Sequence, residues 1–161
     1  MIPRITAGFV FAHPARIIAL GFGTGLVPVA PGTAGTLLAF PIFVLLDAWL
    51  DPLPLFGVIV GLFAIGVWAC GRTGRDLGVA DHSAMNWDEV VAMLLVLLVA
   101  PSGPVWWTFA FFAFRFFDVV KPPPIGDIDR TLKGGLGVML DDILAAFYTL
   151  LLIALVKRVL G

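Results

Sequence analysis

The sequence predicts an all-α fold, that of a small integral membrane protein built from short helices. The first observation is the composition: 60% of the 161 residues are hydrophobic and only 13% are charged, whereas a soluble domain usually has about 25% charged residues. The second is that most charged residues fall in two stretches, 71–89 and 115–142. The third is that the stretches between them are apolar, as expected for helices in contact with lipid.

We expect a single domain over residues 1–161, with a polar N-terminal segment 1–20 and a core at about 21–158, because domains commonly have about 100–150 residues. Ten Lys and Arg against eleven Asp and Glu give a net charge of −1. This balance offers no basic surface to a phosphate backbone, so nucleic-acid binding is excluded. The single cysteine, Cys70, cannot form an internal disulfide and is expected in the core.

The apolar stretches predict five helices. In chain order these are 37–50, 54–71, 89–100, 104–117 and 142–158. Segments of 12–14 residues would span only about 18–21 Å as helix, less than the roughly 30 Å of a hydrocarbon core. We therefore expect some of them to be re-entrant or shielded by their neighbours.

The segment Pro101-Ser102-Gly103-Pro104 interrupts the third apolar stretch, either as a turn or as a kink. A turn would make 89–117 a helical hairpin whose charged ends return to one side. The positive-inside rule favours the turn, because most basic residues would then be cytoplasmic. Under this topology Lys157 and Arg158 would lie on the opposite side.

Acidic pairs begin two of the expected helices, Asp88-Glu89 and Asp141-Asp142, and Asp118 ends the hairpin. One interpretation is helix capping, since Asn86 and Glu89 fit an N-x-x-E capping box. The other is a metal site, because carboxylates at a membrane edge are costly to desolvate unless a cation binds them. Oxygen ligands with few His or Cys favour Mg²⁺, with Mn²⁺ or Ca²⁺ as alternatives.

A glycine-rich stretch, GFGTGLVPVAPGTAG at 21–35, precedes the first expected helix. Glycines and a helix N-terminus can form an anion site, in which Thr24 and Thr33 would supply hydroxyl groups. The alternative is a helix-packing surface, which is common for glycines in membrane proteins. The stretch fits neither G-x-G-x-x-G nor a P-loop, so nucleotide-binding motifs are excluded.

The third polar motif is FRFFDVVKPPPI at 114–125. Arg115 and Asp118 are neighbours on one helix face, and Lys121 precedes three prolines that must end the helix. A fixed Arg and Lys beside carboxylates would suit a phosphate group. A surface ion pair with a snorkelling Lys is the alternative.

Four motifs in this order resemble the phosphatidylglycerophosphatase A family. They are GFGTGLVPVAPGTAGT (21–36), DHSAMNWDEVV (81–91), FRFFDVVKPPPI (114–125) and DRTLKGGLGVMLDDILA (129–145). The resemblance implies a multi-pass protein of the bacterial inner membrane with its active site facing the cytoplasm. It also implies a Mg²⁺-dependent phosphatase that hydrolyses phosphatidylglycerophosphate to phosphatidylglycerol and phosphate, in phosphatidylglycerol and cardiolipin synthesis.

The resemblance also assigns roles to residues of this sequence. The acidic positions, expected to bind metal and take part in catalysis, are Asp88, Glu89, Asp118, Asp141 and Asp142. The basic positions, expected to bind the substrate phosphate, are Arg115, Lys121 and Arg130. His82 is a further candidate for proton transfer. Ala92 and Ala146 stand where the family commonly has glycine, and each adds only a methyl group.

A different class of function, a membrane cation or proton transporter, would also use carboxylates. A transporter should hold them at mid-depth on discontinuous helices, whereas here they lie in polar segments flanking the apolar stretches. A lipid-binding scaffold without catalysis would need the basic residues but not five carboxylates. The sequence therefore favours the phosphatase, and it leaves the oligomeric state open.

Overall fold

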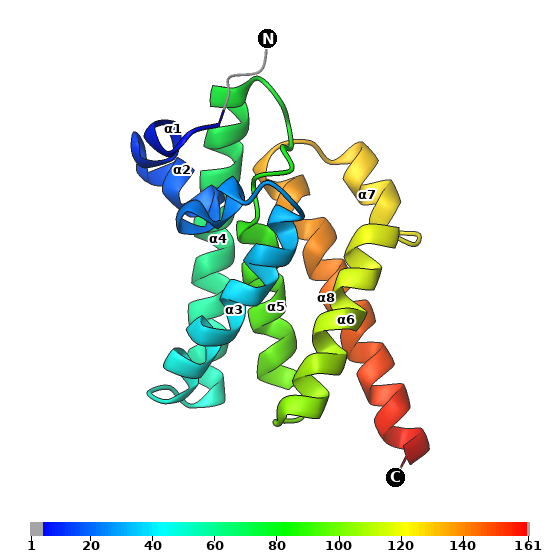
Figure 1. Ribbon diagram of the computed structural model, residues 1–161. Coiled ribbons are helices and arrows are strands. Elements are labelled where there is room, and N and C mark those ends of the chain that lie inside the picture. The colour runs from blue at the N-terminus through cyan, green and yellow to red at the C-terminus, as the bar shows by residue number, and fades with distance from the viewer. Residues whose placement is uncertain (1–4, 161) are drawn as a thin grey trace.

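The computed structural model describes residues 5–160, and this part of the chain is helical without any strand. The elements, in order, are α1 (Ala7–Phe11), α2 (Pro14–Ala19), a 3-10 helix η1 (Gly21–Leu26), α3 (Pro31–Asp47), α4 (Pro52–Leu77), α5 (Trp87–Val99), α6 (Pro104–Val120), α7 (Ile125–Thr131) and α8 (Gly135–Leu160). The all-α fold predicted from the sequence is confirmed (Figure 1).

Helix α5 forms the centre of the bundle. Ten of its thirteen residues are buried, and it packs against α3, α4, α6 and α8. A helix that is apolar on all sides has to be surrounded, because each face must be removed from water or packed against other helices. The first turn of α5 carries Asp88 and Glu89, so the most enclosed helix of the fold also carries an acidic pair.

The five long helices alternate in direction, so their polar ends meet at one end of the bundle (Figure 1). Helix α5 runs away from that end, the segment Pro101–Pro104 turns the chain, and α6 returns. The hairpin predicted for 89–117 is therefore confirmed, and the kink is excluded. The last turn of α8 carries Lys157 and Arg158, and it lies at the opposite end of the bundle (Figure 1).

The predicted helix boundaries were too narrow for α4 and α8. Helix α4 continues to Leu77, and this added part is supported by ion pairs of Asp76 with Arg72 one turn earlier and with Arg16 of α2. Helix α8 begins at Gly135 rather than at 142. Gly135, the first residue of α8, marks the place where α8 crosses α4 closely, since a Cβ there would lie 1.9 Å from the carbonyl oxygen of Val67.

Three further helical segments lie in regions that we expected to be polar loop: α1, α2 and α7. Side chains cap the two N-terminal ones, with Thr6 accepting from the Phe9 N–H and His13 accepting from the Ala15 N–H. Helix α2 packs on α4, and α7 packs on α8. Residues 1–4 of the predicted N-terminal segment lie outside the described residues.

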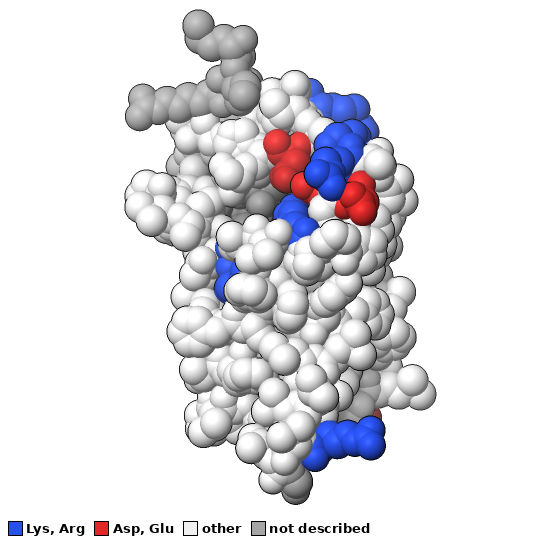
Figure 2. All heavy atoms as spheres, turned by 90° about the vertical axis from the view of Figure 1, so that its right-hand side faces the viewer, with Lys and Arg blue, Asp and Glu red and all other residues white. Residues whose placement is uncertain are grey.

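Two helices are long and apolar enough to cross a membrane. Helices α4 and α8 each have 26 residues, with mean hydropathies of 2.3 and 2.1 in their most apolar windows, of which only 28% and 22% is buried inside the bundle. Figure 2 shows most of the charged side chains on this face toward one end of the molecule and basic side chains at the other end, with a broad and mostly uncharged belt between them. An exposed apolar belt of this kind is what lipid contact requires.

The close crossing of α4 and α8 leads to a first prediction. Gly135→Ala should lower the free energy of unfolding by about 1–3 kcal/mol, because the added methyl group meets backbone that cannot rotate away. Thermal unfolding in detergent measures the effect. Gly61→Ala on α4 is the matched control, since a Cβ there meets nothing within 4 Å; equal melting temperatures for the two variants would contradict the close-crossing interpretation.

Candidate active site

Five carboxylates from three helices converge at the polar end of the bundle. Asp88 and Glu89 come from α5, Asp118 from the last turn of α6, and Asp141 and Asp142 from α8. All five residues are at most 9% exposed. Their oxygens form two triads in which all atoms lie within 4.8 Å of one another. One triad consists of Asp88, Asp141 and Asp142, and the other consists of Glu89, Asp118 and Asp142. The structure therefore brings together all five acidic residues expected from the sequence.

The carboxylate oxygens are buried but incompletely paired. Among the described residues, Asp88 Oδ1, Glu89 Oε2 and Asp142 Oδ2 have no hydrogen-bond partner. Buried polar atoms are nearly always satisfied, and an unpaired carboxylate oxygen is among the most costly exceptions. Two oxygen triads that share Asp142 fit one or two hard divalent cations, whose preferred ligands in proteins are carboxylate oxygens.

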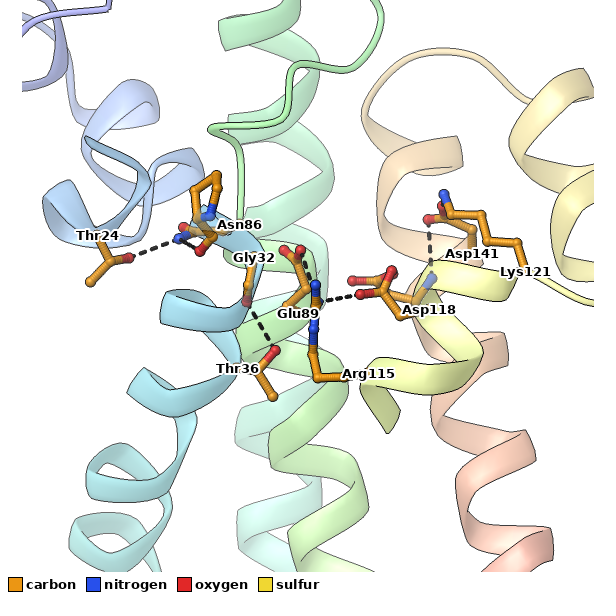
Figure 3. A network of polar contacts seen from close by, with 11 residues as sticks. Thr24, Gly32, Thr36, Asn86, Glu89, Arg115, Asp118, Lys121 and Asp141 are labelled. Carbon is orange, nitrogen blue, oxygen red and sulfur yellow. Dashed lines mark hydrogen bonds and ion pairs between the residues drawn. The ribbon is translucent and has the colours of Figure 1, made fainter. Parts of the chain in front are cut away.

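Arg115 and Lys121 border this cluster from α6 (Figure 3). Arg115 donates to Asp118 and also reaches Glu89 Oε1, at 3.5 Å from Nη1. Lys121 donates to Asp141 and lies 3.3 Å from an oxygen of Asp129. Burial alone would disfavour the Lys121 ammonium, but the hydrogen bond and charge of Asp141 and the charge of Asp129 outweigh it and raise the pKa of Lys121. Lys121 is therefore held charged beside the carboxylates.

The N-terminus of α3 closes the opposite side of the site. A Cβ on Gly32 would lie 2.1 Å from Glu89 Oε1 and 3.2 Å from Arg115 Nη1, so only glycine fits there. Between these elements lies a cavity of about 240 Å³. Its lining consists of Ala30, Pro31, Gly32, Asp81, Ser83, Met85, Asp88, Glu89, Arg115, Asp118, Val119, Lys121, Asp141 and Asp142.

The capping interpretation of the acidic pairs is wrong in two respects. Asn86 precedes α5, but its side chain makes no capping hydrogen bond. Instead its amide donates to the carbonyl oxygen of Pro31 and to the hydroxyl of Thr24, at 2.8 and 2.9 Å (Figure 3). Asp141 and Asp142 lie almost two turns inside α8, too far from its end to cap it. Asp88 and Glu89 do lie in the first turn of α5, where the helix dipole favours them, but a capping box does not explain either acidic pair.

The glycine-rich stretch combines the two interpretations considered for it. Gly25 and Gly35 pack so closely on the segment before α5 that a Cβ on either would meet the backbone of Ala84 or Asn86. This part of the stretch is therefore a helix-packing surface, which was the alternative to an anion site. Yet its later part, Ala30 to Gly32, also lines the cavity.

Four residues predicted at the site lie outside the cavity lining. Thr24 binds Asn86 and the carbonyl oxygen of Gly21, and Thr33 is in the first turn of α3. His82 accepts from the Ala84 N–H through Nδ1, and the largely exposed Arg130 pairs with Asp127 on α7. Their roles in phosphate binding and proton transfer stay predictions. These four residues could contact a substrate only if the substrate extended beyond the cavity.

Sequence reasoning missed Asn86 as a bridging residue and Ser83 as a cavity residue. The motif DHSAMNWDEVV contains both, but its spacing predicts a cap for Asn86 rather than a link to a segment 55 residues earlier. Asp129 was also missed as a partner of Lys121. Only its position in the charged stretch 115–142 hinted at such a contact.

Comparisons with known proteins give a consistent result. Residues 17–157 match the family described as Phosphatidylglycerophosphatase A. The chain is 41% identical over 143 residues to a Haemophilus influenzae protein named Phosphatidylglycerophosphatase A, which covers 88% of this chain and 87% of the relative. It is also 41% identical over 136 residues to an Escherichia coli protein of the same name, and this match covers 83% of this chain and 78% of the relative.

A third relative carries a different name. A Bacteroides thetaiotaomicron protein, provisionally named phosphatidylinositol-3-phosphatase, is 40% identical over 152 residues, covering 90% of this chain and 94% of the relative. No solved structure matches the chain significantly.

The bridging contacts of Asn86 lead to a second prediction. Asn86→Ala should lower the free energy of unfolding by about 1–3 kcal/mol, because it removes the buried amide that donates to the carbonyl oxygen of Pro31 and to the hydroxyl of Thr24. Thr24→Val, which removes one of the two Asn86 contacts and keeps the other, should cost less. Thermal unfolding of both variants in detergent measures this order, and the reverse order would contradict it.

Proposed function

Because the chain belongs to the phosphatidylglycerophosphatase A family and is thus a phosphatase of phosphoric monoesters, we propose that it hydrolyses phosphatidylglycerophosphate to phosphatidylglycerol and phosphate. The observation that carries the proposal is the cavity of about 240 Å³ in which five buried carboxylates and two basic side chains meet at the polar end of an apolar bundle. That position suits a phosphate joined to a lipid, with the head group outside the hydrocarbon and the chains within it.

We propose Mg²⁺ as the cofactor, held by some of Asp88, Glu89, Asp118, Asp141 and Asp142. The charges support it, because the cavity lining contains these five carboxylates and Asp81 but only two basic side chains, Arg115 and Lys121. Fully ionised acidic groups would therefore repel an anionic phosphate. The orphaned oxygens of Asp88, Glu89 and Asp142 also need a partner. When bound, Mg²⁺ would supply Lewis acidity toward the phosphate and favour ionisation of the attacking water.

The remaining steps belong to the side chains. Arg115 and Lys121 would bind the non-bridging phosphate oxygens and stabilise the charge that develops on them as water attacks phosphorus. The bond that breaks joins phosphorus to the terminal glycerol oxygen, which leaves with a proton. A carboxylate that is not bound to metal, or His82, would accept the proton of the water or protonate the leaving oxygen.

We propose that the protein lies in a bacterial inner membrane as a multi-pass protein, with the cavity facing the cytoplasm, and acts in phosphatidylglycerol and cardiolipin synthesis. The positive-inside rule supports this orientation. Four basic residues lie at the cavity end of the bundle: Arg115 and Lys121 in the cavity lining, and Arg16 and Arg72 in ion pairs near the end of α4. Only Lys157 and Arg158, among the basic residues named here, lie at the other end. The carboxylates gather at that one end, which favours the phosphatase over the transporter alternative.

The third prediction concerns the carboxylates. Asp88→Asn, Glu89→Gln and Asp141→Asn should each reduce phosphate release by at least about 100-fold, because each removes a carboxylate that would hold the metal or transfer a proton. Asp127→Asn is the control, since Asp127 is exposed on α7 and pairs with Arg130 outside the cavity. Phosphate release by purified protein in detergent, with unfolding temperatures to verify folding, measures the effect. Full activity in all three carboxylate variants would contradict the proposed site.

The fourth prediction concerns the metal. Treatment with EDTA should abolish phosphate release, and Mg²⁺ should restore it. Titration calorimetry with Mg²⁺ alone should detect binding to the wild type and weaker binding to Asp142→Asn, because Asp142 belongs to both oxygen triads. Undiminished turnover in EDTA would exclude the metal. Assays with phosphatidylinositol-3-phosphate and phosphatidate test the head group, given the name of the Bacteroides relative.

A further inference from the structure

A second cavity lies on the membrane side of the site, between the same two helices that flank the site cavity. It has a volume of about 350 Å³, within the range of small-ligand pockets. Its lining comes from α3 and α6 and consists of Leu37, Phe40, Pro104, Trp107, Thr108 and Phe111. We call it the α3–α6 groove. The lining offers only two polar side-chain groups, the hydroxyl of Thr108 and the indole N–H of Trp107, so the groove is largely apolar.

Aromatic rings hold the two walls together. Phe40 of α3 lies 6.0 Å from the ring of Trp107 and 6.3 Å from that of Phe111, and Phe43 packs edge-on against Trp107 at 5.9 Å. Other lining residues remain open to the outside: Leu37 is 53% exposed, and Pro104 and Thr108 are exposed as well. The groove therefore has a packed aromatic floor and a mouth toward the surroundings of the bundle.

The groove and the active site follow one another along the same face of α6. Trp107, Phe111, Arg115 and Asp118 follow one another at intervals of four, four and three residues, which places them on one face of the helix. The first two line the groove and the last two line the site cavity. One helix face thus passes from apolar to charged at Arg115.

Helix α3 shows the same order on the other wall. Gly32 touches the site at Glu89, and Leu37 and Phe40, five and eight residues further on, line the groove. At 1.5 Å per residue the groove residues lie roughly 6–17 Å along the helices from the residues of the site. That direction leads into the apolar part of the bundle (Figure 1).

We propose that the α3–α6 groove binds an acyl chain of the substrate lipid while its phosphate occupies the carboxylate cavity. The alignment of the two cavities along the same two helices carries this proposal, which rests on the phosphatase function proposed above. A phospholipid has the matching layout, with an anionic head joined to apolar chains that extend from it. Binding energy from the chain would then hold the phosphate in position for the reaction.

Kinetics with two substrates test the proposal. Thr108→Trp should fill the groove, and because Thr108 is exposed the fold should tolerate the change. We expect kcat/KM for long-chain phosphatidylglycerophosphate to fall by about tenfold or more. The value for the deacylated head group, glycerophosphoglycerophosphate, should stay unchanged. Leu151→Trp is the matched control, since Leu151 is a 68% exposed residue of α8 outside the groove, and it should leave both values unchanged.

The outcomes separate the two proposals. An equal fall for both substrates, or no fall for the long-chain substrate, would overturn the groove and leave the phosphatase intact. Failure of the wild type to hydrolyse either substrate would instead overturn the proposed function, and the groove proposal with it.

Cross-linking provides a readout that does not depend on activity. A phosphatidylglycerophosphate with a diazirine in the middle of one acyl chain would be bound to Asp88→Asn protein and irradiated. We expect labelled peptides from α3 and α6, and loss of the label in the double variant with Thr108→Trp. Labelling spread evenly over the exposed faces of α4 and α8 would overturn the proposal.

Discussion

The electrostatic cost of placing five carboxylates inside the end of an apolar bundle is the constraint on which the rest of the structure depends. A buried carboxylate without a partner costs several kcal/mol, and like charges at close range add to that cost. Arg115 and Lys121 offset part of it through Asp118 and Asp141. The unpaired oxygens of Asp88, Glu89 and Asp142 remain, so the folded protein keeps a strong demand for positive charge at one place.

Close packing elsewhere serves to hold these groups together. Helix α5 carries two of the carboxylates and is surrounded by other helices, so its position determines theirs. Glycines at 25, 32 and 35 allow the segment before α3 and the helix itself to approach the start of α5 without a side chain between them. Asn86 then links the two segments by hydrogen bonds to Thr24 and Pro31. The site is rigid because its supports are backbone and buried amide groups rather than exposed side chains.

Much of this arrangement could be predicted from the sequence, because charge placement and helix-breaking residues act locally. The helical hairpin followed from Pro101 to Pro104, and the convergence of Asp88, Glu89, Asp118, Asp141 and Asp142 followed from the hairpin and the four motifs. The true ends of α4 and α8 could not be predicted, since they depend on the pairing of Asp76 with Arg16 and on the contact of Gly135 with Val67. The link from Asn86 to Pro31 was equally hidden, because residues 55 positions apart come together only in the folded chain.

The order of the carboxylates along the chain has a consequence for biosynthesis. Asp88 and Glu89 belong to the third long helix to be made, whereas Asp141 and Asp142 belong to the last. Both oxygen triads include a residue of that last helix. A nascent chain in which α3 to α6 have formed therefore holds Asp88, Glu89 and Asp118 but no complete triad. Both triads are completed in the same step, when α8 docks, so a full set of oxygen ligands exists only at the end of synthesis.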